Sequence, residues 1–247
     1  LSHQAGLAGF ADPIDPALWL EPRALAADLA KLAPLWPPET GSGYHPQTWG
    51  FLAGEIVERV AGVSLGTLLR QQITHTPDET IDFFIGTPAT EHGRIAEMAK
   101  PKSPPQLGEI SPEARIAFLT RWAAPNRGGA VWREVEIPST NGHGTARATA
   151  RLYGLYANQG RLGGRSLLSP ERFAALTRVR TSGQDRVLPF AIDFAAGVMV
   201  NAQKVYGPNP NSFGHSGWGG SMGLADPDRG LSAAYVMNQQ SSFLQVD

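Results

Sequence analysis

The sequence of 247 residues contains no cysteine, which excludes disulfide bonds, thiolate nucleophiles and cysteine-ligated zinc together. The cytosol and the exterior of the cell both accommodate a protein without cysteine, so the compartment is left open. The sequence also lacks an apolar run of the roughly 18 residues that a membrane-spanning helix needs. We therefore expect no membrane span.

A strong charge of either sign is missing as well. The 21 Lys and Arg residues are balanced by 22 Asp and Glu residues, and the basic residues are scattered along the chain. A formal net charge of -1 gives no field that would attract a nucleic acid, so no nucleic-acid partner is expected. With 42% hydrophobic residues and no Ser/Gly-rich linker, the chain is predicted to fold as a single domain over residues 1–247.

Metal-binding and phosphate-binding patterns are absent from the sequence. No two histidines stand three or four positions apart, the spacing that places a ligand pair on one helix face, and no His-Glu-x-x-His motif occurs. The glycine-rich stretch 217–220 is not followed by Lys-Ser or Lys-Thr, so it does not match a phosphate-binding loop. We expect neither a metal nor a cofactor. The six histidines are His3, His45, His75, His92, His143 and His215.

Six stretches carry signals of helix starts or helical periodicity. Ser64, Ser111, Thr145 and Ser169 stand where a side-chain oxygen can cap a helix, and Pro follows directly after two of them. Gly62 is placed to end the helix before it. Helices are expected over residues 22–35, 49–60, 65–73 and 146–156, and from residues 112 and 170 onward.

The last third of the chain is expected to form strands. Residues 190–201 are rich in small and β-favouring types, and Asp-Pro-Asp-Arg-Gly at 226–230 is a turn between two apolar runs. Those runs, 221–225 and 231–238, predict an antiparallel hairpin. Helices followed by sequential strands indicate an α+β fold in which helices pack on an antiparallel sheet.

The stretch Gly-His-Ser-Gly-Trp at 214–218 begins like a nucleophile elbow. The fifth residue is Trp218 where that motif needs glycine, and strand-like sequence follows instead of a helix. Ser216 is therefore not expected to be an α/β-hydrolase nucleophile. A tight bend between two strands is the structural alternative for this glycine-rich piece.

Several separated segments form a recognisable series. They are Leu-Ser-His-Gln-Ala-Gly-Leu at residues 1–7, Tyr44, Trp-Gly-Phe-Leu-Ala-Gly-Glu-Ile-Val-Glu at 49–58, Gly-Thr-Ala-Arg at 144–147, Asn-Gln-Gly-Arg-Leu-Gly-Gly at 158–164 and Phe-Gly-His-Ser-Gly at 213–217. In this order they resemble the serine β-lactamase-like hydrolases, which include class C β-lactamases, D-alanyl-D-alanine carboxypeptidases and esterases of the same fold. The resemblance runs nearly from end to end and implies a β-lactamase/penicillin-binding-protein-like fold.

The resemblance implies a mechanism in which a serine of a Ser-x-x-Lys turn attacks an acyl carbon while a tyrosine carries protons. Tyr44 takes the position of that tyrosine, and His215 is expected beside it across one cleft. The backbone N–H of Trp218 would serve as an oxyanion donor. The remaining predicted substrate-binding residues are Ser216, Gly217, Gly219 and Asn141. The structural alternatives are a loop tyrosine, a turn histidine and a packing tryptophan.

Two departures from the family pattern limit what the resemblance implies. The tyrosine motif usually carries Asn two positions after Tyr, but this chain has Tyr44-His45-Pro46, and Pro46 offers no donor to an amide substrate. This favours the esterase members. The second departure is that no Ser-x-x-Lys occurs. The four lysines and the residues three positions before them are Lys31 after Asp28, Lys100 after Glu97, Lys102 after Ala99 and Lys204 after Asn201.

We therefore expect a domain that is incomplete at both ends. The partner it would need is an N-terminal segment carrying Ser-x-x-Lys upstream of Leu1, and a closing helix would follow Asp247. The leading hypothesis is a serine carboxylesterase that acts on small-molecule esters through an acyl-enzyme in the intact protein, with this chain inactive alone. The alternatives are a D-alanyl peptidase or β-lactamase, and an inactive homologue that serves as a binding module.

Overall fold

A computed structural model describes residues 1–103, 109–118 and 125–242. The helices are α1 (Pro22–Leu29), α2 (Thr48–Ala61), α3 (Leu65–Leu69), α4 (Pro112–Phe118), α5 (Ala130–Glu134), α6 (Ala146–Ala157) and α7 (Pro170–Thr177). Short two-residue strands are β1 (His75–Thr76), β2 (Glu79–Thr80), β3 (Phe83–Phe84), β4 (His143–Gly144), β5 (Arg161–Leu162) and β6 (Arg165–Ser166). The main-sheet strands are β7 (Asp193–Phe194), β8 (Met199–Val200), β9 (Phe213–Ser216), β10 (Met222–Asp226) and β11 (Leu231–Tyr235).

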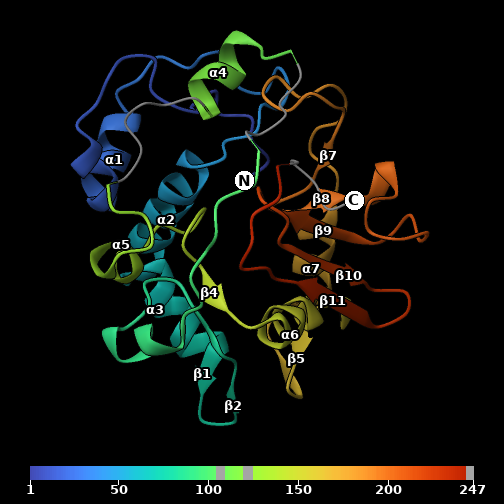
Figure 1. Cartoon of the computed structure of the whole chain (residues 1–247). Helices are drawn as coiled ribbons and strands as arrows, with labels where there is room; N and C mark the ends of the chain where they lie inside the picture. The colour runs from blue at the N-terminus through green and yellow to red at the C-terminus, as the bar shows by residue number, and fades with distance from the viewer. Residues whose placement is uncertain (104–108, 119–124, 243–247) are drawn as a thin grey trace.

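The main sheet is an antiparallel meander in the order β11-β10-β9-β8-β7, so every strand pairs with its neighbour along the chain. Figure 1 shows this sheet on one side of the molecule and helices α1, α2, α3 and α5 on the other. The predicted α+β class and the predicted hairpin, now β10 and β11, are confirmed. None of the described helices is both long and apolar enough to cross a membrane.

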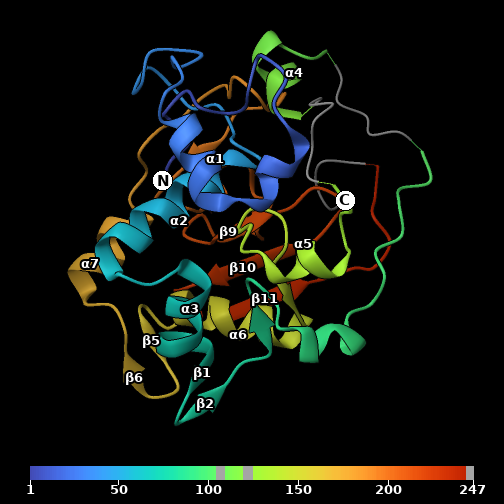
Figure 2. The same cartoon turned by 90° about the vertical axis from the view of Figure 1, so that its left-hand side faces the viewer.

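The two faces of the sheet are buried differently. On one face α6 packs along β10 and β11, and Phe213 and Ala225 form a core with residues of α6 and α7; Figure 2 shows α6 running beneath these strands. On the other face Met199, Tyr206 and Phe194 form a second core. A separate core fills the helical part, where Trp19, Leu25, Leu29 and Phe51 are buried with Phe10 and Ile137.

The predicted caps account for most helix starts. The side-chain oxygens of Ser64, Thr145 and Ser169 accept the N–H groups of Thr67, Ala148 and Arg172. Ser111 likewise accepts the N–H of Ala114. Gly62 ends α2 with a left-handed φ of 72°.

Two helices differ in extent from the prediction. The first ends at Leu29 rather than near Leu35, because Pro34 disfavours helical geometry at the residue before it, and the chain turns so that the Leu35 N–H donates to Gly6 O. The helix after Ser64 is α-helical only to Leu69, and residues 70–74 continue as a π turn. Pro34 could have predicted the earlier end of the first helix from the sequence. The π turn has no comparable sequence marker.

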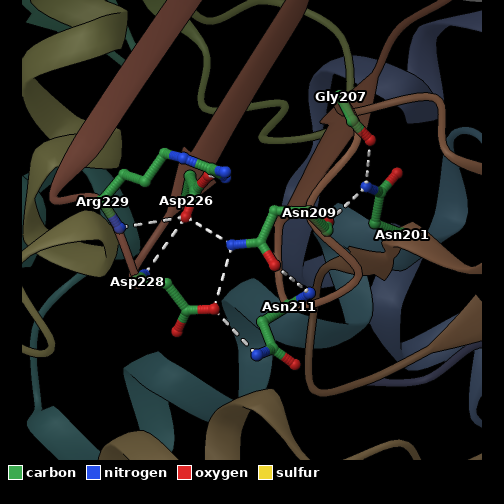
Figure 3. Close-up of polar contacts among 7 residues, drawn as sticks. All are labelled: Asn201, Gly207, Asn209, Asn211, Asp226, Asp228 and Arg229. Carbon is green, nitrogen blue, oxygen red and sulfur yellow. Dashed lines mark hydrogen bonds and ion pairs between the residues drawn. The ribbon is translucent and has the colours of Figure 1, made fainter.

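A polar network fastens the β10–β11 turn to the segment that precedes β9 (Figure 3). One oxygen of Asp226 accepts the N–H groups of Asp228 and Arg229 and the amide of Asn209. Asp228 in turn accepts the side-chain amides of Asn209 and Asn211. Charge-assisted bonds of this kind are about twice as strong as neutral ones, so the turn is fixed by side chains as well as by its glycine.

Glycine is required where α6 crosses β10. A Cβ on Gly223 would lie 2.1 Å from the ring of Tyr153. We predict that Gly223→Ala lowers the free energy of unfolding by about 2 kcal/mol, the usual cost of overpacking, in urea denaturation followed by circular dichroism. Gly93→Ala is the matched control, since nothing lies within 4 Å of its added carbon. Equal stability of the two variants would contradict close packing at this crossing.

Candidate active site

Tyr44 lies in an irregular loop before α2, and the backbone donors of residues 43–45 are taken up by distant groups. The N–H of Gly43 donates to the carbonyl of His3 over 3.0 Å. The N–H of Tyr44 donates to Asp185 Oδ1 over 2.9 Å, and the N–H of His45 donates to His3 Nδ1 over 3.0 Å. Buried backbone donors need acceptors, so His3 and Asp185 determine where this loop can lie.

The buried side chain of His45 also holds this loop in place. The side chain is 2% exposed, its Nδ1 donates to Gly43 O over 2.5 Å, and its Nε2 accepts the N–H of Leu7 over 3.0 Å. These two bonds define the neutral tautomer with the proton on Nδ1. Burial lowers the pKa of His45 to about 4, because the charged ring would lose its hydration.

His3 packs directly against Tyr44, the candidate catalytic residue. Its ring centroid lies 4.9 Å from that of Tyr44 and 4.6 Å from that of Phe194. The residue adopts a left-handed φ of 57°, which is costly for a residue with a Cβ and is maintained by its two hydrogen bonds to the loop. Burial is the main cause that lowers its pKa well below the ordinary value, so the ring is neutral.

The structure brings Tyr44 and His215 together, although they are far apart in the sequence. Their ring centroids lie 5.7 Å apart, and both side chains are partly exposed. His215 Nδ1 donates to Ser216 O over 2.9 Å, and burial lowers the pKa of His215. Burial raises the pKa of Tyr44 well above its usual range, and the phenol of Tyr206 and the carboxylate of Asp185 add to this effect. Both rings are therefore neutral in this chain.

Ser216 occupies a buried position in β9. Its exposed fraction is 8%. Burial raises the pKa of the neighbouring Tyr206 to about 12, although Ser216 acts in the opposite direction. A substrate role for Ser216 stays a prediction.

A tight turn joins β9 to β10, as the bend alternative proposed. The Gly217 N–H donates to Ser221 O over 2.7 Å, and the Gly220 N–H donates to Gly217 O over 3.1 Å. The indole of Trp218 packs on Phe118 with centroids 5.1 Å apart. Within residues 1–103, 109–118 and 125–242, no group accepts the backbone N–H of Trp218. The Trp218 ring therefore packs on Phe118, while its backbone N–H is not used by any described group.

Gly219 occupies the most constrained position of this turn. Its φ is 91°, and a Cβ would lie 3.0 Å from the side chain of Gln240. Its carbonyl accepts the N–H of Ser241 over 2.8 Å, so the segment that follows β11 supports the turn. The predicted substrate contact by Gly219 is untested; its backbone role is clear.

Asn141 is buried and bonded within its own loop. The side chain is 1% exposed, its Oδ1 accepts the N–H of Ile137, and its Nδ2 donates to the carbonyls of Trp132 and Val135. Both donors of the amide are thereby used. Asn141 holds the loop between α5 and β4 together, and a substrate-binding role for it stays a prediction.

Sequence reasoning assigned no role to His3 and did not consider Asp185. His3 was visible in the Leu-Ser-His segment, but only the fold shows that its ring meets Tyr44. Asp185 carries no sequence signal, because it acts on a residue 141 positions away.

All four lysines are exposed, and the contacts that the described residues make with Tyr44 include none of them. The described residues also contain no group of three or more His, Asp or Glu side chains that could hold a metal. Two prominent hollows, of about 380 and 760 Å³, are lined by neither Tyr44 nor His215. The cleft expected between these two residues stays a prediction, and the structure shows their rings adjacent and partly exposed.

Comparison with known proteins decides the family. The sequence model of the family described as Beta-lactamase matches residues 1–246. The chain belongs to the beta-lactamase family. It is 32% identical to the esterase/beta-lactamase LipL of Mycobacterium tuberculosis over 97% of this chain and 57% of the relative. The resemblance read from the sequence is thereby confirmed.

Solved structures of the beta-lactamase family superpose closely on this chain. A penicillin-binding protein homologue from Caulobacter crescentus is 51% identical, with a TM-score of 0.94 over 100% of this chain and 66% of that structure. A family VIII carboxylesterase is 35% identical, with a TM-score of 0.88 over 98% of this chain and 65% of that structure. The predicted fold is confirmed, and the chain spans between 57% and 66% of the length of these relatives.

The buried, neutral His45 predicts a loss of stability in acid. Its pKa is about 4 in the folded protein and about 6.5 in the unfolded chain, so the unfolded state binds the proton first. The free energy of unfolding should fall by about 3 kcal/mol from this residue as the pH is lowered from about 6.5 to 4. Urea denaturation at a series of pH values measures the slope, and His45→Gln should flatten it. An unchanged slope in that variant would show that His45 is not the responsible group.

Proposed function

We propose that the chain is the larger part of a serine carboxylesterase that hydrolyses small-molecule esters through an acyl-enzyme. The observation that carries the proposal is the pairing of the Tyr44 and His215 rings at 5.7 Å in a chain of the beta-lactamase family. The nucleophilic serine and its lysine would come from polypeptide outside residues 1–247, because no Ser-x-x-Lys occurs within them.

Tyr44 transfers the proton in each step of the proposed reaction. The serine hydroxyl oxygen bonds to the acyl carbon, and its proton passes to the Tyr44 phenolate. The proton then goes to the alcohol oxygen as the ester bond breaks. Water attacks the acyl-enzyme, gives a proton to Tyr44, and the carboxylic acid leaves as the serine recovers that proton. The backbone N–H of Trp218 would serve as one donor to the oxyanion.

Tyr44 requires a nearby cation to act as a base. Burial and the Asp185 carboxylate raise its pKa, so the phenol keeps its proton in this chain. The neighbouring His215 is itself neutral, since burial lowers its pKa. A lysine ammonium close to the phenol would reverse the balance, which is the role proposed for the lysine of the outlying Ser-x-x-Lys.

The residues after Tyr44 favour an ester over an amide substrate. His45 is 2% exposed and both of its ring nitrogens are bonded to backbone groups, those of Gly43 and Leu7, while Pro46 has no side-chain donor. Neither His45 nor Pro46 therefore offers a side-chain donor to a substrate amide. Among the relatives, one is named an esterase/beta-lactamase and another a family VIII carboxylesterase, which supports the same choice.

A fluorophosphonate, which traps activated serines, tests where the nucleophile lies. We predict a covalent adduct on the intact protein at a serine outside residues 1–247, and no adduct on the 247-residue chain alone. The chain alone should also fail to hydrolyse p-nitrophenyl acetate, since a proton carrier and an oxyanion donor without a nucleophile leave little catalysis. An adduct on Ser216, with turnover that Ser216→Ala abolishes, would overturn the proposal.

Removal of one hydroxyl tests Tyr44. In the intact protein Tyr44→Phe should lower kcat for p-nitrophenyl esters by about 10²–10⁴-fold, the usual effect of losing a positioned proton carrier, with an unchanged circular dichroism spectrum. Tyr235→Phe is the matched control, because Tyr235 is 52% exposed on β11. Near-normal kcat in folded Tyr44→Phe would assign Tyr44 a structural role and reject the mechanism.

A further inference from the structure

We propose that Asp185 is a positioning residue for Tyr44: its carboxylate fixes both the backbone of Tyr44 and the residues that enclose the Tyr44 ring. The proposal rests on the function proposed above, because it concerns the placement of the same phenol. No contact with substrate is required of Asp185, which is 3% exposed.

One oxygen of Asp185 organises three backbone groups. Asp185 Oδ1 accepts the N–H of Tyr44 over 2.9 Å, the N–H of Val187 over 2.9 Å and the N–H of Leu188 over 2.8 Å. Next to it the Arg186 N–H donates to Ser42 O over 3.0 Å. The loop around residue 186 is thus bonded to the residues on both sides of Gly43. It supports the tyrosine loop, by which we mean residues 43–45.

The same bonds set the walls around the Tyr44 ring. Val187 belongs to a hydrophobic cluster with Trp36 against which Tyr44 packs, and Leu188 belongs to a second cluster that also contacts Tyr44. Val187 and Leu188, whose N–H groups Asp185 also accepts, therefore belong to the two clusters against which Tyr44 packs. A shift of the carboxylate would move the tyrosine backbone and both walls together.

The second oxygen, Asp185 Oδ2, is buried and has no hydrogen-bond partner among the described residues. Exchange of this oxygen for an amide nitrogen would therefore break no bond that the structure shows. Asp185→Asn retains the Oδ1 acceptor and removes the charge, whereas Asp185→Ala leaves three N–H groups without their acceptor. The two variants separate hydrogen bonding from charge.

The kinetic test uses the intact protein and p-nitrophenyl esters. Asp185→Ala should lower kcat by about 10²-fold with little change in KM, because displacement of a catalytic group by about 1 Å costs that much. Asp185→Asn should recover most of this loss. Loss of the negative charge should also move the limb of the kcat–pH profile that reports Tyr44 toward lower pH, since the carboxylate raises the pKa of the phenol.

A spectroscopic test does not depend on activity. Incorporated 3-fluorotyrosine gives one ¹⁹F signal per tyrosine, and Tyr44→Phe identifies the signal of Tyr44. A single sharp signal should persist in Asp185→Asn and should broaden or split in Asp185→Ala, because the ring then loses its fixed surroundings.

Asp226 is the matched control (Figure 3). It is also a buried aspartate, 6% exposed, and its Oδ1 also accepts two backbone N–H groups of the turn that follows it. Asp226→Ala should lower stability without changing the Tyr44 signal or the kcat–pH profile. This comparison separates positioning of Tyr44 from a general effect of losing a buried carboxylate.

The outcomes distinguish the two proposals. If Asp185→Ala and Asp226→Ala lose equal activity and the Tyr44 signal stays sharp in both, Asp185 does not position Tyr44. If Tyr44→Phe is fully active while the Tyr44 signal still broadens in Asp185→Ala, the catalytic role of Tyr44 is rejected and its placement by Asp185 stands.

Discussion

The need to satisfy three consecutive buried N–H groups shapes the centre of this protein. Residues 43–45 form no helix or strand, so their donors cannot be paired locally and must find acceptors elsewhere in the chain. His3 supplies two acceptors, one from its backbone and one from its ring, and Asp185 supplies the third. The N-terminal segment, the tyrosine loop and the loop before β7 are thereby joined at one point, and the Tyr44 ring is directed toward β9.

Neutral side chains surround the candidate site. Burial lowers the pKa values of His3, His45 and His215 and raises that of Tyr44, so each of these groups carries no charge near neutral pH. The Asp185 carboxylate lies against this neutral set with one oxygen unpaired among the described residues. A cation introduced beside Tyr44 would therefore meet little competing charge, and its influence on the phenol would be strong.

Local signals in the sequence predicted the elements well, because caps and glycine stops act within a few residues. Ser64, Thr145, Ser169 and Gly62 mark helix boundaries that the structure shares, and the turn at 226–230 lies where its Asp-Pro-Asp-Arg-Gly sequence placed it. The family pattern predicted the meeting of Tyr44 and His215, which no periodicity would reveal. The hydrogen bonds of two residues were not predictable. Asn141 bonds to backbone groups within its own loop, and Asp185 has no neighbour in sequence that points to Tyr44.

The sheet order has a consequence for the sequence of events during folding. A meander in which each strand pairs with the next requires only short loops to close, so β7 to β11 can form as an early, local unit. The contacts of Tyr44 join residues 3, 44, 185 and 215, which are far apart in the sequence. The entropy lost in bringing them together is compensated only when the helical part docks on the sheet. Chains stalled before docking would show native-like strand content without an assembled tyrosine loop.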